Sequence, residues 1–125
     1  MNLSRNFIAI GSLYIILGVA IGMYMGASQD HTLIPLHAHI NLLGFVLPMA
    51  FGLTYAVFPA AGDNGLARAH FWLHEIGTLV LLIMLGLLLT GRIAEEAMFP
   101  IAPLAELLVL LGLVAFAANV FRAVR

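Results

Sequence analysis

The chain has 125 residues, of which 63% are hydrophobic and only 9% are charged. Its mean hydropathy of +1.10 excludes a water-soluble domain, because such a domain needs a much larger charged surface. The net charge is −1 and the basic residues are scattered singly, which excludes a basic patch for nucleic acid. Cysteine is absent, so the sequence offers no disulfide, thiolate ligand or covalent haem attachment. We expect one small domain, residues 1–125, embedded in a lipid bilayer.

Four stretches of the chain are long and apolar enough to cross a membrane. A spanning helix needs ~20 mostly apolar residues to cross a hydrocarbon core of ~30 Å. The predicted helices cover residues 6–27, 34–58, 66–90 and 101–120. Pro48 lies inside the second and should kink or loosen it. The fold class expected is therefore all-α, an integral membrane four-helix bundle.

Glycines recur at every fourth position of the first predicted helix, at Gly18, Gly22 and Gly26. Small residues at this spacing let another backbone approach closely within a bilayer. The stripe is either a specific packing or oligomer face, or only the general glycine richness of membrane helices.

The distribution of arginine predicts the orientation in the membrane. Four arginines lie on the side that holds both termini: Arg5, Arg68, Arg122 and Arg125. The other side has only Arg92, beside two glutamates. Because cytoplasmic segments carry the excess of positive charge, both termini should be cytoplasmic. We expect a multi-pass protein of a bacterial or archaeal plasma membrane.

Polar side chains within these helices are functional candidates, because placing a polar group in the hydrocarbon core of a bilayer costs free energy. The candidates are His37, His39, Asn41, His70, His74, Glu75, Glu106 and Asn119. His37 and His39 are two residues apart and point to nearly opposite faces of a helix, so they cannot chelate one metal. His70 and His74 have the i,i+4 spacing of a helical chelate. Neutral imidazole is also the usual axial ligand of a haem held between membrane helices.

Two consecutive segments resemble a known family. Residues 36–44, Leu-His-Ala-His-Ile-Asn-Leu-Leu-Gly, resemble the haem-bearing helix of the haem–copper oxidase and nitric oxide reductase large subunit, with its His-x-His motif and following glycine. Residues 69–77, Ala-His-Phe-Trp-Leu-His-Glu-Ile-Gly, resemble the start of that family's next helix. The similarity continues between them through Gly52, Tyr55, Phe58 and Pro59. It covers under half of the chain.

The resemblance implies a haem b protein, a miniature relative of that subunit. It implies that His37 ligates a gas-binding or catalytic haem and that His39 ligates an electron-transfer haem. The family's copper ligands lie on helices with no counterpart here, so the implied work is electron transfer or binding of a diatomic gas such as O2 or NO. The second axial position would be open, or filled by His70, His74, His31 or a neighbouring protomer of a homo-oligomer.

The intramembrane carboxyl groups have supporting roles in this interpretation. Glu106 is expected near the level of His37 and His39, where it could orient an imidazole or carry a proton. Glu75 could form a proton relay with His74. His70 lies near the inner interface, where a hydrogen bond to a neighbouring helix is the simpler interpretation.

Two other interpretations stay open. The first is a non-haem copper or zinc site, or a proton site, for transport or sensing, built from His37, His39, His74 and Glu106. The second is a structural subunit that packs against a larger oxidase through the glycine stripe.

Overall fold

The computed structural model describes residues 1–124, and every regular element within them is a helix. The elements are α1 (Leu3–Ser28), α2 (Ile34–His39), the π-helix η1 (Ile40–Val46), α3 (Leu47–Val57), α4 (Pro59–Gly62), α5 (Gly65–Leu89), the 3-10 helix η2 (Glu95–Met98) and α6 (Ile101–Ala123). Because α2, η1 and α3 follow one another without a break, they form one long rod. The all-α four-helix bundle expected from the sequence is confirmed, and the helix ends lie close to those expected.

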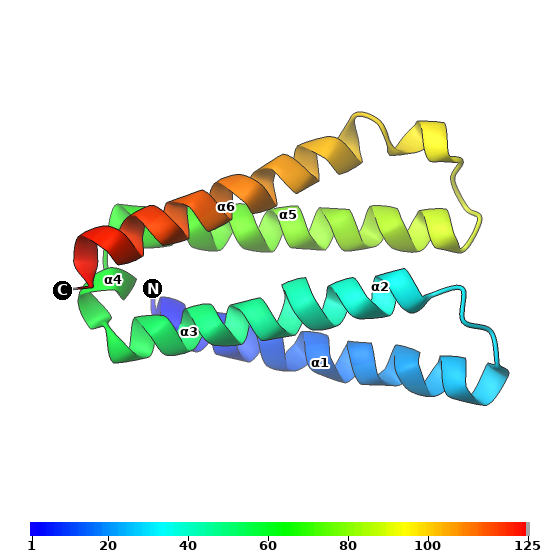
Figure 1. Cartoon of the computed structure of the whole chain (residues 1–125), viewed down its shortest axis with the longest axis horizontal. Helices are drawn as coiled ribbons and strands as arrows, with labels where there is room; N and C mark the ends of the chain where they lie inside the picture. The colour runs from blue at the N-terminus through cyan, green and yellow to red at the C-terminus, as the bar shows by residue number, and fades with distance from the viewer. Residues whose placement is uncertain (125) are drawn as a thin grey trace.

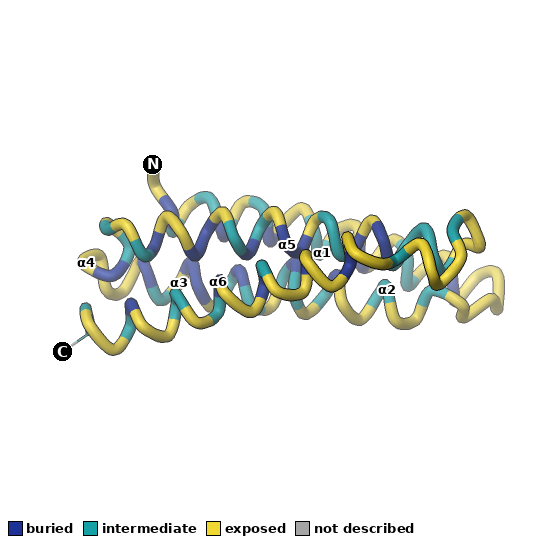
Figure 2. Tube along the Cα trace, turned by 90° about the horizontal axis from the view of Figure 1, so that it is seen from above, coloured by how far each residue is buried: buried dark blue, intermediate teal, exposed yellow. Residues whose placement is uncertain are grey.

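The four long rods are built for a membrane. Each of them is long and apolar enough to span a bilayer. Large apolar side chains face outward along them, including Leu13, Met23 and Phe121, which are 68%, 71% and 87% exposed. Figure 2 shows exposed positions along the outer sides of the helices and buried positions between them. Soluble proteins rarely expose so much contiguous apolar surface. The chain is therefore a multi-pass membrane protein.

The bundle consists of two helical hairpins lying side by side (Figure 1). One pairs α1 with the rod α2–η1–α3, and the other pairs α5 with α6. Both termini lie at one end of the bundle, and the loops 29–33 and 90–100 lie at the other.

The glycine stripe of α1 is used within the chain. A Cβ at Gly18 would collide with the side-chain amide of Asn41, and one at Gly22 would lie 3.0 Å from Cε1 of His37. A Cβ at Gly26 would meet nothing within 4 Å. The two inner glycines therefore make room for the polar side chains of the next rod, as small residues do at helix contacts in bilayers.

The π-helix η1 ends where Pro48 removes a donor. Its last bond runs from the N–H of Leu47 to the carbonyl of Leu42, five residues back. In the same register the next donor would be residue 48, facing the carbonyl of Leu43, but proline has no N–H. The sequence-based expectation of a disturbance at Pro48 is thus met by a widened turn just before it.

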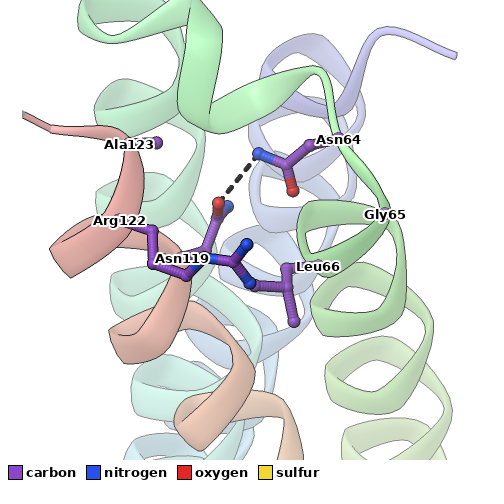
Figure 3. Close-up of a pocket in the computed structure, with 6 residues that line it drawn as sticks. All are labelled: Asn64, Gly65, Leu66, Asn119, Arg122 and Ala123. Atoms are coloured by element: carbon purple, nitrogen blue, oxygen red, sulfur yellow. Dashed lines mark hydrogen bonds between the residues drawn. The ribbon is translucent and has the colours of Figure 1, made fainter.

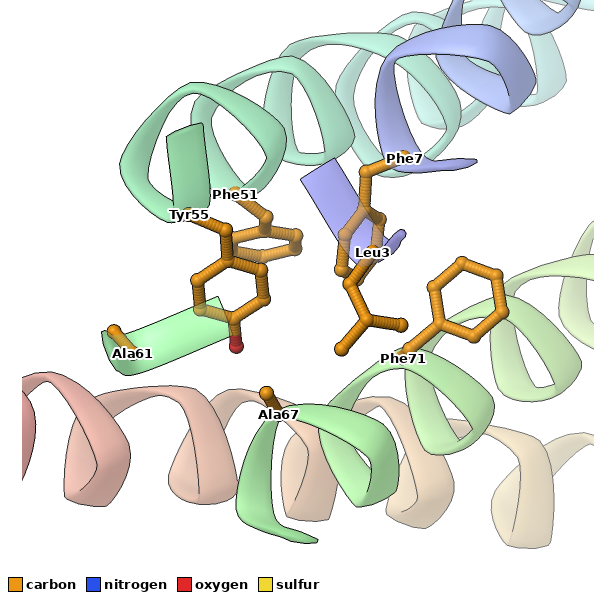
Figure 4. Packing of buried hydrophobic residues seen from close by; sticks show 7 residues of the cluster. All are labelled: Leu3, Phe7, Phe51, Tyr55, Ala61, Ala67 and Phe71. Atoms are coloured by element: carbon orange, nitrogen blue, oxygen red, sulfur yellow. The ribbon is translucent and has the colours of Figure 1, made fainter. Parts of the chain in front are cut away.

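Two groups of side chains close the end of the bundle that holds the termini. Figure 4 shows the apolar one, a cluster of Leu3, Phe7, Phe51, Tyr55, Ala61, Ala67 and Phe71. The polar one is centred on Asn119, which donates to the carbonyl of Ala61 at 2.6 Å and accepts from Asn64 at 2.8 Å. These two asparagines and Arg122 line a surface hollow of about 440 Å³. Figure 3 shows their side chains, with the hydrogen bond between the two asparagines as a dashed line. These bonds join α6 to the turn that precedes α5.

Candidate functional site

His37 lies between α1 and α2 and has both ring nitrogens engaged. Its Nδ1–H donates to the carbonyl of Gly18 at 2.8 Å. That proton leaves Nε2 as an acceptor, and the amide of Asn41 lies 3.3 Å from it. Its ring is partly buried against the glycine face of α1. In this packing His37 is a bridge between two helices.

His39 points the opposite way, as the two-residue spacing predicts. Its Nδ1–H donates to the carbonyl of Pro35, one turn back in the same helix, at 2.7 Å. This bond fixes the tautomer, and the lone pair of Nε2 has no hydrogen-bond partner among residues 1–124. The residue is exposed on the outside of the rod. An imidazole anchored through Nδ1 with a bare Nε2 is the form that ligates metal ions.

A groove of about 360 Å³ opens beside His39. It lies where η1, α5, η2 and α6 come together, and its lining is Leu42, Leu43, Leu81, Leu85, Met98, His39 and Glu106. Four leucines make it mostly apolar, whereas His39 and Glu106 give it two polar side chains. The level predicted for Glu106 from its position in the last helix thus agrees with the structure.

His74 is buried inside the bundle and bonded to the π-helix. Its Nε2–H donates to the carbonyl of Leu43 at 2.9 Å. That carbonyl is the one left without a backbone donor by Pro48, so His74 supplies the missing hydrogen bond. His74 is fully buried, and its packing leaves no room for a porphyrin at that nitrogen.

His70 is also fully buried, one turn before His74. The hydroxyl of Tyr55 lies 2.7 Å from its Nδ1, which joins α5 to α3. The inter-helix hydrogen bond expected for His70 is therefore present, and the tyrosine is its partner.

Glu75 and His31 lie apart from these groups. Glu75 is half-buried, and one of its carboxyl oxygens is buried without a hydrogen-bond partner among residues 1–124. It makes no hydrogen bond to His74 within that part of the chain. His31 is exposed in the loop 29–33, where its Nδ1 bonds to the carbonyl of Gln29 at 3.1 Å.

Sequence reasoning grouped the histidines correctly as intramembrane candidates but missed several partners. The sequence did not identify Tyr55 as a hydrogen-bond partner, gave Met98 no role and did not predict the π-helix. Only Pro48 signalled the last of these, since a proline inside a membrane helix implies a carbonyl in need of another donor.

Comparisons of the chain with protein-family models, curated proteins and solved structures gave no match. The resemblance to the haem–copper oxidase large subunit therefore stays a prediction from the motif.

Proposed function

We propose that the protein is a membrane-embedded b-type haem protein in which His39 ligates the haem iron and a diatomic gas binds at the opposite axial position. The observation that carries the proposal is the bare Nε2 of His39 beside an apolar groove, with Nδ1 held by the carbonyl of Pro35. Bound there, the haem would supply an iron that changes oxidation state and binds O2 or NO.

The residues at the groove fit such a group in three respects. The walls are leucines, which suit the apolar face of a porphyrin. The ligand imidazole is held by a backbone carbonyl, which fixes its orientation. Among residues 1–124 that line the groove, His39 is the one histidine, so no second imidazole of the same chain would compete for the iron there.

The groove would contact only one face of a haem macrocycle. It has about 360 Å³ and opens towards the outside of the bundle, so a macrocycle seated there would need a second wall. We propose that a second copy of the chain supplies that wall, giving a homo-oligomer with its sites between protomers. The setting proposed is a bacterial or archaeal plasma membrane with both termini cytoplasmic, and a redox partner would reduce the iron.

The rival metal site is less well supported. Among the described residues, no three histidine, aspartate or glutamate side chains lie close enough together to hold a metal ion. His37 and His74 also have their nitrogens turned to Gly18 and Leu43, away from the groove.

An absorption spectrum of the purified protein, produced with haem supplied, tests the proposal. The wild type should show a Soret band and about one haem per chain by the pyridine haemochrome method, and His39→Phe should lose both. His31→Phe is the matched control and should keep them. A wild-type protein without haem, or a His39→Phe variant that retains a full Soret band, would refute His39 as the ligand.

The open axial position has its own measurement. Carbon monoxide added to the reduced protein should shift the Soret band, because an open iron position binds it. An unchanged spectrum would show a second protein ligand and would contradict gas binding. Met98, which lines the groove, would then be the first candidate for that ligand.

A further inference from the structure

Two imidazoles on one face of α5 each keep one ring nitrogen without a partner. His70 and His74 are both 0% exposed. Nε2 of His70 and Nδ1 of His74 have no hydrogen-bond partner among the described residues. Buried polar atoms are almost always paired, and leaving one unpaired costs free energy. Two such nitrogen atoms one helical turn apart indicate a shared ligand, such as a metal ion that both rings coordinate.

The bonds to the other two nitrogens show which form each ring takes. A carbonyl can only accept, so His74 must donate through Nε2 to Leu43, and its Nδ1 is a bare lone pair. The Tyr55 hydroxyl lies 2.7 Å from Nδ1 of His70. In the tautomer whose Nδ1–H donates to that hydroxyl, Nε2 of His70 is a lone pair as well. Histidines that ligate metals are typically anchored in this way, through the nitrogen that does not bind the ion.

The spacing of the two rings suits one shared ion. Residues at i and i+4 lie on the same helix face, and helical metal sites commonly use two histidines at that spacing. The ring centroids are 6.1 Å apart, which matches two imidazoles holding one ion at ~2 Å per bond.

The side chains around the two histidines favour an ion of low charge and low coordination number. Aromatic rings enclose His70, with centroids at 4.3 Å for Phe51, 5.0 Å for Phe7 and 5.1 Å for Phe116. No third histidine, cysteine or carboxylate joins the pair among residues 1–124. Zn²⁺ takes four ligands in structural sites, and a divalent charge in an apolar shell without an anion is costly. Cu⁺ carries one charge and accepts two nitrogen ligands in a nearly linear arrangement.

We propose that Nε2 of His70 and Nδ1 of His74 together bind one Cu⁺ ion. The site lies in the interior between α3 and α5, distinct from the groove at His39. It needs no haem, so it stands or fails independently of the function proposed above.

Anaerobic titration of the purified, haem-free protein with Cu⁺ in the presence of the chromophoric chelator bicinchoninate tests the site. The wild type should withdraw one equivalent of Cu⁺ from the chelator, and His70→Phe should withdraw none. His31→Phe should behave as the wild type. His70 is the better residue to replace, because His74 also supports the π-helix. Full retention of Cu⁺ by a folded His70→Phe variant, or no withdrawal by the wild type, would overturn the proposal.

X-ray absorption at the copper edge decides the matter if His70→Phe fails to fold. The copper-loaded wild type should show two nitrogen ligands at about 2 Å and no sulfur. A coordination number of three or more, or a sulfur ligand, would place the ion elsewhere. Titration with Zn²⁺ under the same conditions should give no stoichiometric binding, and tight zinc binding would contradict the assignment to Cu⁺.

Discussion

The pairing of His74 with Pro48 predicts a specific energetic coupling. The carbonyl of Leu43 lies in the π-helix, where Pro48 provides no N–H, and it accepts instead from Nε2 of His74 at 2.9 Å. Replacing His74 by phenylalanine keeps an aromatic ring against Phe7 and Phe51, which surround it. The substitution removes the donor and leaves the carbonyl unpaired.

The expected magnitude follows from the cost of one buried carbonyl without a partner. Such a group costs about 1–3 kcal/mol in proteins, and hydrogen bonds between helices within membranes contribute about 0.6–2 kcal/mol. We therefore expect His74→Phe to lower the free energy of unfolding by about 1–2 kcal/mol. In a Pro48→Ala background, residue 48 regains an N–H that can serve the π-helix. There the same substitution should cost less, with a coupling of about 1 kcal/mol.

Unfolding by SDS in mixed micelles measures the four proteins of this cycle. His70→Phe is the matched control, because His70 bonds to Tyr55 and not to the π-helix, so its cost should be the same with either residue at position 48. Additive effects of His74→Phe and Pro48→Ala would refute the reasoning. Such a result would mean that the histidine does not replace the proline's missing donor.

Three further predictions concern stability and the outer loop. Gly18→Ala should lower the unfolding free energy by about 1–3 kcal/mol, because the new Cβ would collide with the side-chain amide of Asn41. Gly26→Ala should be nearly neutral in the same SDS assay, since a Cβ at that position would meet nothing within 4 Å. Asn119→Leu should cost about 1–3 kcal/mol, since it removes one buried and one partly buried hydrogen bond at the end of the bundle; an unchanged midpoint would argue against their importance. Hydrogen bonds from the hydroxyl and N–H of Thr32 hold the pKa of Asp30 below its ordinary value, so Thr32→Val should raise that pKa, as titrated by NMR.

The architecture could be predicted from the sequence because a bilayer imposes a simple rule. Backbone groups in hydrocarbon must find hydrogen-bond partners within the protein, and a continuous apolar stretch of about 20 residues satisfies its own groups by forming a helix. The pattern of glycines in α1 offered a packing face as one of two interpretations. It could not show the partner, because whether Gly18 faces another protomer or the next rod depends on how the hairpin closes.

The site was only partly predictable. The sequence shows which side chains are polar, but it does not show the hydrogen-bond partner of each histidine ring nitrogen. Helical spacing correctly placed His37 and His39 on opposite sides. It gave no means of knowing that His37 would find the carbonyl of Gly18 and His39 would not cross to another helix. The role of His74 was also out of reach, since it depends on the wider i→i+5 hydrogen bonding of the π-helix Ile40–Val46 and on which carbonyl that segment leaves without a backbone donor.

If the chain binds haem as proposed, the hydrogen bonds of its intramembrane histidines favour one haem per chain over the two that the resemblance implies. In the resemblance, adjacent histidines of the His-x-His pair each serve a haem. In this chain, the face of His37 is occupied by the backbone of α1, which approaches closely because Gly18 and Gly22 lack side chains. A haem on that side would have to displace α1 from its hairpin. The face of His39 needs no such rearrangement, because its anchoring bond stays within its own helix and its side chain lines the groove. The same motif can therefore combine one structural imidazole with one imidazole that is free to bind iron.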